Sequence, residues 1–119
     1  MKRYPLLVTV ALPCLMVGGA ATAAFFDGNK LFQECQGGDD PRQSEQGDPG
    51  KSTEWGECLG YILGVEDALD GTAFCLPDGV RSRQVRDIVT LWLQGHPETR
   101  HYEAQSLVIT ALKEKFPCH

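Results

Sequence analysis

Cysteine and histidine are the residues of this chain whose side chains most readily act as nucleophiles or metal ligands. The 119-residue sequence has five cysteines and three histidines. It contains no C-x-x-C motif, and the cysteine spacings fit neither a zinc site nor a haem attachment site. The G-x-S-x-G and H-E-x-x-H motifs of hydrolases are also absent from the sequence. We therefore predict no catalytic residue, no metal ion and no cofactor, and expect a binding protein rather than an enzyme.

One metal site remains as an alternative. His96, Glu98 and His101 lie close together in the sequence and are residue types that bind transition metals. The two histidines are five residues apart, however, whereas a helix brings ligands together at a spacing of four. The pattern therefore favours a polar turn, which Pro97 also indicates.

The N-terminal segment has the features of an export signal. Lys2 and Arg3 precede an apolar run, and Ala21-Thr22-Ala23 has the form of a signal-peptidase site. We predict that residues 1–23 are a signal peptide, cleaved after Ala23 or else after Ala24, and that residues 24–119 form one exported domain. The alternative is an uncleaved N-terminal anchor. Cleavage would remove two basic residues and no acid, which would lower the formal net charge from −5 to −7.

Apolar residues recur at helical spacing in four segments of the remaining chain. These segments are residues 27–36, 54–69, 82–94 and a last stretch that begins between 98 and 103 and ends near 116. Residues 39–51 contain no apolar side chain, so we expect an exposed loop there, followed by Ser52 or Thr53 as a helix cap. Ser82 is the expected cap of the third helix. The fold class predicted is all-α, a small disulfide-bonded four-helix domain.

Four cysteines remain after the predicted cleavage, and an even number in a small exported domain indicates two disulfides. Three pairings are possible for Cys35, Cys58, Cys75 and Cys118. Short connections make successive helices antiparallel, as in an up-and-down bundle. In that arrangement the end of the first helix meets the start of the second, and the ends of the second and fourth helices lie at one pole. Helix order therefore favours Cys35–Cys58 and Cys75–Cys118.

Glycines recur every four residues along the second predicted helix. Gly56, Gly60 and Gly64 follow this spacing, and Ala68 continues it. Each glycine inside a helix costs about 1 kcal/mol relative to alanine, so their regular spacing suggests a compensating contact. We predict that these three glycines are helix-packing residues, which let a second protein helix approach closely. The alternative is that Gly56 lies in a frayed first turn and Gly60 fills a tight position.

The charged residues are distributed unevenly along the chain. Twelve acids but only three bases lie between Asp27 and Asp78. The excess of acid argues against nucleic acid and anionic membranes as partners. Arg81, Arg83 and Arg86 form a basic cluster on the third predicted helix, and we predict that they bind a partner protein. The alternative is that these arginines pair with acids of the same chain.

Several short segments together resemble a known family. These segments are Cys58-Leu59-Gly60-Tyr61-Ile62-Leu63-Gly64 with Asp67, Phe74-Cys75-Leu76-Pro77, Gln84, Trp92-Leu93 with His96-Pro97, Ala104, Leu107-Val108, Ala111-Leu112 and Phe116-Pro117-Cys118. They are similar to the Rap/Tai family of type VI secretion amidase immunity proteins. The resemblance implies a periplasmic, all-helical, disulfide-bonded homodimer that binds and blocks a papain-like peptidoglycan amidase effector of the NlpC/P60 kind.

The long polar loop at residues 39–51 departs from the family pattern. The small, helical, exported and disulfide-bonded domain also fits a second class of protein, an acid-stress periplasmic chaperone of the Hde type. The acids before Gly79 would lose charge at low pH, which would loosen a dimer of that kind.

Overall fold

The computed structural model describes residues 26–37 and 48–119 of the chain. The predicted signal peptide and residues 39–47 of the predicted loop lie outside the described residues. The described part is all-helical and contains no strand. Its elements are α1 (Gly28–Gly37), α2 (Pro49–Leu69), α3 (Ser82–Gly95), the 3₁₀ turn η1 (Pro97–Thr99) and α4 (Ala104–Lys115). The predicted all-α class, with four helices and two disulfides, is confirmed.

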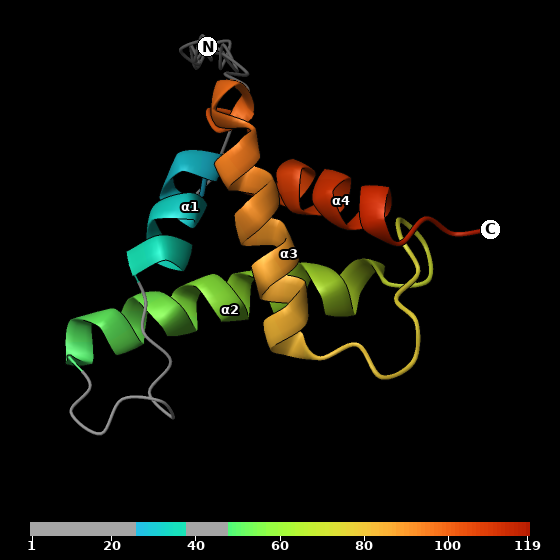
Figure 1. Cartoon of the computed structure of the whole chain (residues 1–119), viewed down its shortest axis with the longest axis horizontal. Helices are drawn as coiled ribbons and strands as arrows, with labels where there is room; N and C mark the ends of the chain where they lie inside the picture. The colour runs from blue at the N-terminus through green and yellow to red at the C-terminus, as the bar shows by residue number, and fades with distance from the viewer. Residues whose placement is uncertain (1–25, 38–47) are drawn as a thin grey trace, which may run out of the picture.

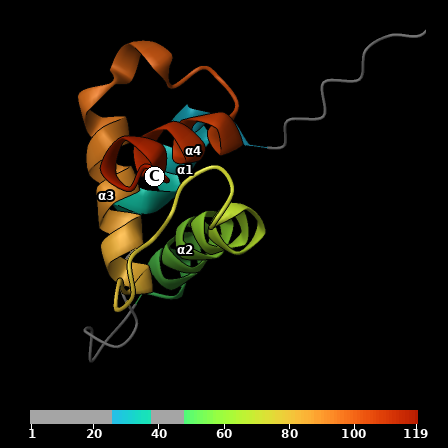
Figure 2. The same ribbon diagram turned by 90° about the vertical axis from the view of Figure 1, so that its right-hand side faces the viewer.

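The four helices are not arranged as an up-and-down bundle. Helix α3 runs beside α1 but crosses α2 steeply, and α1, α3 and α4 lie together on one side of α2 (Figures 1 and 2). The prediction that each helix lies antiparallel to the next was based on short connections. The segment of residues 70–81 between α2 and α3 is long enough to let α3 turn across α2 instead.

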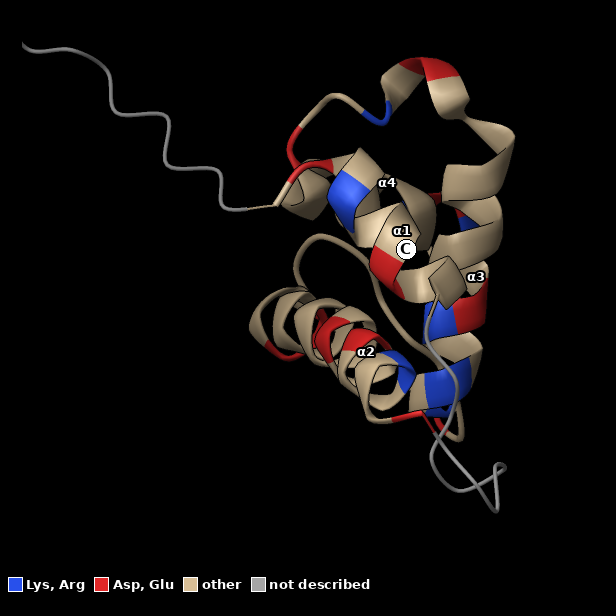
Figure 3. Cartoon of the chain, turned by 90° about the vertical axis from the view of Figure 1, so that its left-hand side faces the viewer, with Lys and Arg blue, Asp and Glu red and all other residues tan. Residues whose placement is uncertain are grey.

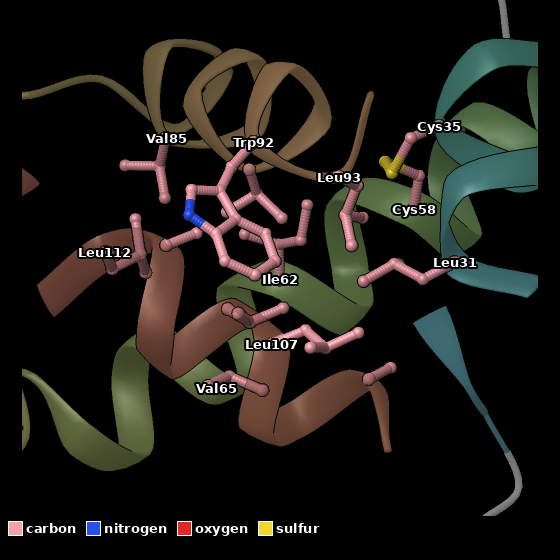
Figure 4. Packing of buried hydrophobic residues seen from close by; sticks show 14 of the residues in the cluster. Leu31, Cys35, Cys58, Ile62, Val65, Val85, Trp92, Leu93, Leu107 and Leu112 are labelled. Atoms are coloured by element: carbon pink, nitrogen blue, oxygen red, sulfur yellow. A yellow bond between two sulfur atoms is a disulfide. The ribbon is translucent and has the colours of Figure 1, made fainter. Parts of the chain in front are cut away.

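Every helix contributes to one hydrophobic core. Leu31 of α1, Ile62 of α2, Leu93 of α3 and Leu112 of α4 are all completely buried, and Figure 4 shows them converging from the four helices. Burying a side chain of this size stabilises a fold by about 1.5–3 kcal/mol. Phe74 is also completely buried, although it lies outside the helices, so the connection between α2 and α3 is part of the core.

Two disulfides join the elements in the predicted pairing. Cys35 at the end of α1 is bonded to Cys58 of α2, and both residues are buried. Cys75 is bonded to Cys118, which ties the connection after α2 to the C-terminal segment after α4. A backbone hydrogen bond joins the same two segments, because the Cys75 N–H donates to the Phe116 carbonyl at 2.8 Å. The predicted pairing is correct although the helices are arranged differently from the prediction, because the pairing depends only on which helix ends lie close together.

Helix α2 begins earlier than predicted. Asp48 is its N-cap, and the Asp48 side chain accepts a hydrogen bond from the Gly50 N–H at 2.8 Å. Pro49 occupies the first turn, where its fixed φ suits a helix and its missing N–H costs nothing. The prediction of Ser52 or Thr53 as the cap was therefore wrong, because the Asp-Pro pair is a stronger start signal.

The connection between α2 and α3 is held by its own hydrogen bonds. The Asp70 carboxylate accepts from the Leu76 N–H at 2.8 Å, and the Gly71 N–H donates to the Phe74 carbonyl at 2.8 Å. Gly71 has a φ of 81°, which other residues rarely adopt. This turn directs Phe74 into the core and leads the chain back along α2 to the start of α3 (Figure 1). It thereby places Arg81 next to α2.

Candidate partner-binding groove

Helix α2 has a second apolar stripe beside the one it buries in the core. Cys58, Ile62 and Val65 are buried, whereas Trp55, Leu59 and Leu63 are only half-buried. The helical spacing of residues 54–69 predicts that Trp55 and Leu59 lie on the same core face of this helix as Cys58 and Ile62. The structure places Trp55 and Leu59 at the margin of that face, because α3 crosses α2 steeply and covers only part of it (Figure 2).

These three side chains form the apolar part of a groove. Trp55, Leu59 and Leu63 line it from α2, and Arg81, Ser82 and Arg83 line it from the start of α3. The basic segments at the start of α3 lie next to α2 in Figure 3. The groove therefore combines large apolar side chains with two guanidinium groups.

The start of α3 adds further positive potential to this groove. Arg81 is the N-cap of α3 and provides no side-chain hydrogen bond to the helix, so Ser82 is not the cap we predicted. The first turn of α3 contains no acid. Backbone N–H groups at a helix start lack partners within the helix and carry partial positive charge, which acids or capping oxygens ordinarily offset. Arg81 and Arg83 lie at this same end, so the start of α3 is basic.

Arg86 has a different role from Arg81 and Arg83. Its guanidinium donates to the Cys35 carbonyl at 2.8 Å and contacts the Asp87 carboxylate at 3.2 Å. Its side chain is only 18% exposed, so it connects α3 to the end of α1 rather than lining the groove. The structure thus brings two of the three predicted arginines to the groove, whereas Arg86 binds the end of α1.

The glycine side of α2 is not packed against any other described helix. A Cβ atom added at Gly56, Gly60 or Gly64 would meet nothing within 4 Å in the described structure. Gly60 and Gly64 line a shallow hollow together with Tyr61, Val65, Ala68 and Gln105 of α4. No described element of this chain supplies the second helix that we predicted to pack against these glycines.

Glu66 is the unusual acid of α2. Its Oε2 atom is buried and has no hydrogen-bond partner among the described residues. Burial raises the pKa of Glu66, and the nearby negative charges of Asp67 and Asp70 raise it further. Along α2, Glu66 comes about one helical turn after Leu63, which is the last groove residue of that helix.

The histidines engage aromatic rings and backbone. The His96 ring stacks on Trp92 with 4.0 Å between ring centroids, and its Nδ1 lies 2.7 Å from the Trp92 carbonyl oxygen. The ring of His101 contacts Tyr102, so the structure does not assemble the alternative site of His96, Glu98 and His101. Within residues 26–37 and 48–119, no three histidine, cysteine or acidic side chains are close enough to hold a metal ion.

The sequence analysis found the arginines of the groove but not its apolar residues. Leu63 was the residue of the sequence that could have indicated the apolar part of the groove. It is large and apolar, yet it does not lie on the same face of α2 as the buried Cys58 and Ile62. A large apolar residue on the margin of a helix indicates a contact beyond the core. None of the described helices is both long and apolar enough to cross a membrane.

The fold and the groove define a small helical domain, cross-linked by two disulfides, with a surface suited to binding another protein. The family model of the Rap1a immunity proteins matches residues 27–118. The chain therefore belongs to the Rap1a immunity protein family, in agreement with the resemblance noted in the sequence. No curated protein matches the sequence.

Proposed function

We propose that this protein is a periplasmic immunity protein, which binds a peptidoglycan amidase effector of a type VI secretion system and blocks its active site. The observation that carries the proposal is the family match, which spans residues 27–118 and so includes all four helices and both disulfides. An immunity protein needs to cover its target rather than turn over a substrate. The proposal therefore assigns it no catalytic residue and no cofactor.

The proposed location is consistent with the covalent structure. Disulfides form and persist in oxidising compartments such as the periplasm. Both disulfides of this chain lie in the part that follows the predicted signal peptide at residues 1–23. We propose that the mature protein begins near Ala24, carries an excess of negative charge, and binds neither nucleic acid nor membrane.

We further propose that the mature protein is a homodimer. Gly56, Gly60 and Gly64 leave open space along one side of α2, and small residues at this spacing allow two helix backbones to approach closely. A second copy of α2 would supply the contact that the described chain lacks.

Co-expression tests the immunity function directly. An amidase effector from the same genome, targeted to the periplasm of a test strain, should lyse the cells. The full chain should prevent lysis, whereas a variant that lacks residues 1–23 should remain in the cytoplasm and give no protection. Lysis despite periplasmic accumulation of the folded protein, for every amidase tested, would contradict the proposal.

The acid-stress chaperone is not supported by a specific observation. Its mechanism requires acid to loosen the protein. Glu66 acts in the opposite direction, because protonation removes the cost of burying its charge. We therefore retain the immunity function alone.

A further inference from the structure

We propose that Asp78 is a modification site, at which isoaspartate forms spontaneously and lengthens the backbone in front of α3. The site is the Asp78-Gly79 pair in the connection between α2 and α3. The Gly79 nitrogen attacks the Cγ atom of Asp78 and loses its proton, while the protonated carboxyl loses its hydroxyl, so one water leaves and a succinimide ring forms. Water then opens the ring, and opening at the α-carbonyl leaves a main chain that runs through the Asp78 side chain. This modification does not depend on the proposed function.

The first requirement of the reaction is a glycine after the aspartate. A Cβ atom on the following residue hinders the approach of its nitrogen to the aspartate side chain, and glycine has none. The sequence contains three such pairs, which are Asp27-Gly28, Asp70-Gly71 and Asp78-Gly79. Since the two reacting residues are the same in all three, the fold decides which pair reacts.

The second requirement is a glycine nitrogen that is free to move, and two of the pairs lack it. The Gly28 N–H donates to the Tyr102 carbonyl at 2.9 Å, and the Gly71 N–H donates to the Phe74 carbonyl at 2.8 Å. Each hydrogen bond points the nitrogen at its acceptor and must break before that nitrogen can attack the aspartate side chain.

The carboxylates of these two pairs are held as well. The Asp27 carboxylate accepts from the Lys30 N–H at 2.7 Å, and the Asp70 carboxylate accepts from the Leu76 N–H at 2.8 Å. Each side chain must rotate before its Cγ atom reaches the glycine nitrogen that follows. Breaking these hydrogen bonds therefore slows the reaction at Asp27 and Asp70 further.

The Asp78-Gly79 pair has neither constraint. Both residues are exposed in a turn. Among the described residues, neither the Gly79 N–H nor the Asp78 carboxylate takes part in a hydrogen bond. The bond across this turn, from the Val80 N–H to the Pro77 carbonyl, is long at 3.4 Å. The space beside Gly79 is also open, because a Cβ atom there would meet nothing within 4 Å. The fold thus leaves Asp78 as the reactive aspartate of the three.

Isoaspartate at this position should loosen the start of α3. Val80, which packs against the core, follows the turn directly, and Arg81, the N-cap of α3, comes next. On the other side of the turn, Cys75 is fixed by its disulfide to Cys118. An extra backbone atom between these fixed points would displace Val80 and the first turn of α3. Because Arg81 lines the groove, the modification would also change the groove.

Incubation of the folded protein tests the site. The mature, disulfide-bonded protein is kept at about pH 5, where a fraction of the aspartates carries the proton that the reaction needs. Peptide mass spectrometry with electron-transfer fragmentation then locates isoaspartate. It should form at least about fivefold faster at Asp78 than at Asp27 or Asp70, because the other two pairs must first break hydrogen bonds. A rate at Asp27 or Asp70 that equals or exceeds the rate at Asp78 would overturn the inference.

The unfolded protein is the control for sequence effects. In guanidinium chloride the hydrogen bonds of Gly28 and Gly71 are lost, so the three pairs should react at similar rates. A preference for Asp78 that persists unchanged in the denaturant would show that the neighbouring sequence selects this residue, and would overturn the argument from the fold.

Asparagine variants test the same geometry at neutral pH. In Asp78→Asn the leaving group is ammonia, so the reaction is followed by the mass increase of deamidation. Asp70→Asn is the matched control, because it also creates an Asn-Gly pair and its side-chain oxygen can still accept from the Leu76 N–H. Asp78→Asn should deamidate at least about fivefold faster than Asp70→Asn. Deamidation of Asp70→Asn at the same rate or faster would contradict the protection that we assign to hydrogen bonding.

Hydrogen exchange tests the effect on α3. Protein modified at Asp78 is separated from the original protein by chromatography. The modified form should lose protection at the Val85 N–H, which donates to the Arg81 carbonyl at 3.1 Å. The Leu107 N–H, which donates to the Glu103 carbonyl at the start of α4, is the control and should keep its protection. Unchanged exchange at Val85 would show that the lengthened turn leaves α3 undisturbed, against the inference.

Discussion

Gly28 and Gly95 show how differently two glycines in helices can be constrained. Gly28 is buried, and a Cβ atom at this position would lie 2.8 Å from the Arg100 carbonyl oxygen and would also collide with the Leu107 side chain. A Cβ atom at Gly95 would meet nothing within 4 Å. The backbone of α1 thus approaches the segment after η1 at a distance that only glycine permits.

Replacing Gly28 with alanine should therefore destabilise the fold. We expect Gly28→Ala to lower the free energy of unfolding by about 1–3 kcal/mol, because the backbone of Arg100 must move to accommodate the new methyl group. Chemical denaturation of the oxidised protein measures the change. Gly95→Ala is the control and should change stability by less than about 1 kcal/mol. Equal losses of stability for Gly28→Ala and Gly95→Ala would contradict the close approach of the α1 backbone to Arg100.

Glu66 should make the free energy of unfolding depend on pH, because this group stabilises the fold more in acid than at neutral pH. Its pKa in the folded protein is raised above the ordinary value of 4.5, chiefly by burial. The folded state therefore holds this proton more tightly than the unfolded state does. The stabilisation that protonation gives is fully present below the unfolded pKa and is lost as pH rises through the folded pKa.

Substitution of Glu66 by glutamine should remove this dependence. Glu66→Gln keeps the shape of the side chain without its charge, so it should be more stable than the original protein at neutral pH and should lose that advantage in acid. Urea denaturation of both proteins at about pH 3.5 and about pH 7 measures the difference. An advantage that is the same at both values would show that the charge of Glu66 is not destabilising.

At the scale of elements, the sequence predicted the helices better than their arrangement. Periodicity and glycine or proline signals located all four helices, because these signals act within a segment. The start of α2 was missed because Asp48-Pro49 lay inside a polar stretch that looked like a loop. The steep crossing of α3 over α2 was missed because it depends on contacts between distant residues, such as the burial of Phe74.

The same limit applies to the groove. Arg81 and Arg83 were recognised because neighbouring charges are visible in the sequence. Their position beside Leu59 and Leu63 results from the fold of residues 70–81, which no local pattern specifies. Arg86 was grouped with them by sequence, although its contact with the Cys35 carbonyl joins residues 51 positions apart.

The two disulfides should differ in their susceptibility to reduction. Cys35 and Cys58 are 2% and 0% exposed, whereas Cys118 is exposed near the C-terminus. A thiolate must reach a sulfur atom in order to exchange with it. Under limiting reductant at neutral pH, we expect Cys75–Cys118 to open first.

Timed alkylation and peptide mass spectrometry measure the order of reduction. The closed segment between Cys75 and Cys118 has a sequence separation of 43 residues, so losing this link should cost about 3–4 kcal/mol of stability from chain entropy. Unfolding with guanidinium before and after partial reduction gives this value. Earlier labelling of Cys35 and Cys58 would show that the α1–α2 junction opens more readily than the C-terminal segment.

At the scale of the whole molecule, helix α2 has two different open sides, one on either side of the stripe that its buried residues Cys58, Ile62 and Val65 form. One side carries Leu59 and Leu63 and meets the arginines of α3, and the other carries Gly60 and Gly64 beside α4. The homodimer and the effector complex that we propose would need two separate surfaces. Both of these sides of α2 are left open in the described chain, because α3 crosses α2 instead of running along it (Figure 2).

Gly60→Leu separates the role of the glycine side in the dimer from its role in the single chain. A leucine here meets open space in the described chain and removes the cost of glycine in a helix, so the isolated protomer should become more stable by about 0.5–1 kcal/mol. The same leucine would keep two α2 backbones apart. Light scattering after gel filtration, over a range of concentrations, should find a dimer for the original protein and a monomer for Gly60→Leu. Thr110→Leu, at an exposed position of α4, is the control for added apolar surface and should stay dimeric. An original protein that is monomeric at every concentration would refute the homodimer, and a dimeric Gly60→Leu would place the interface elsewhere.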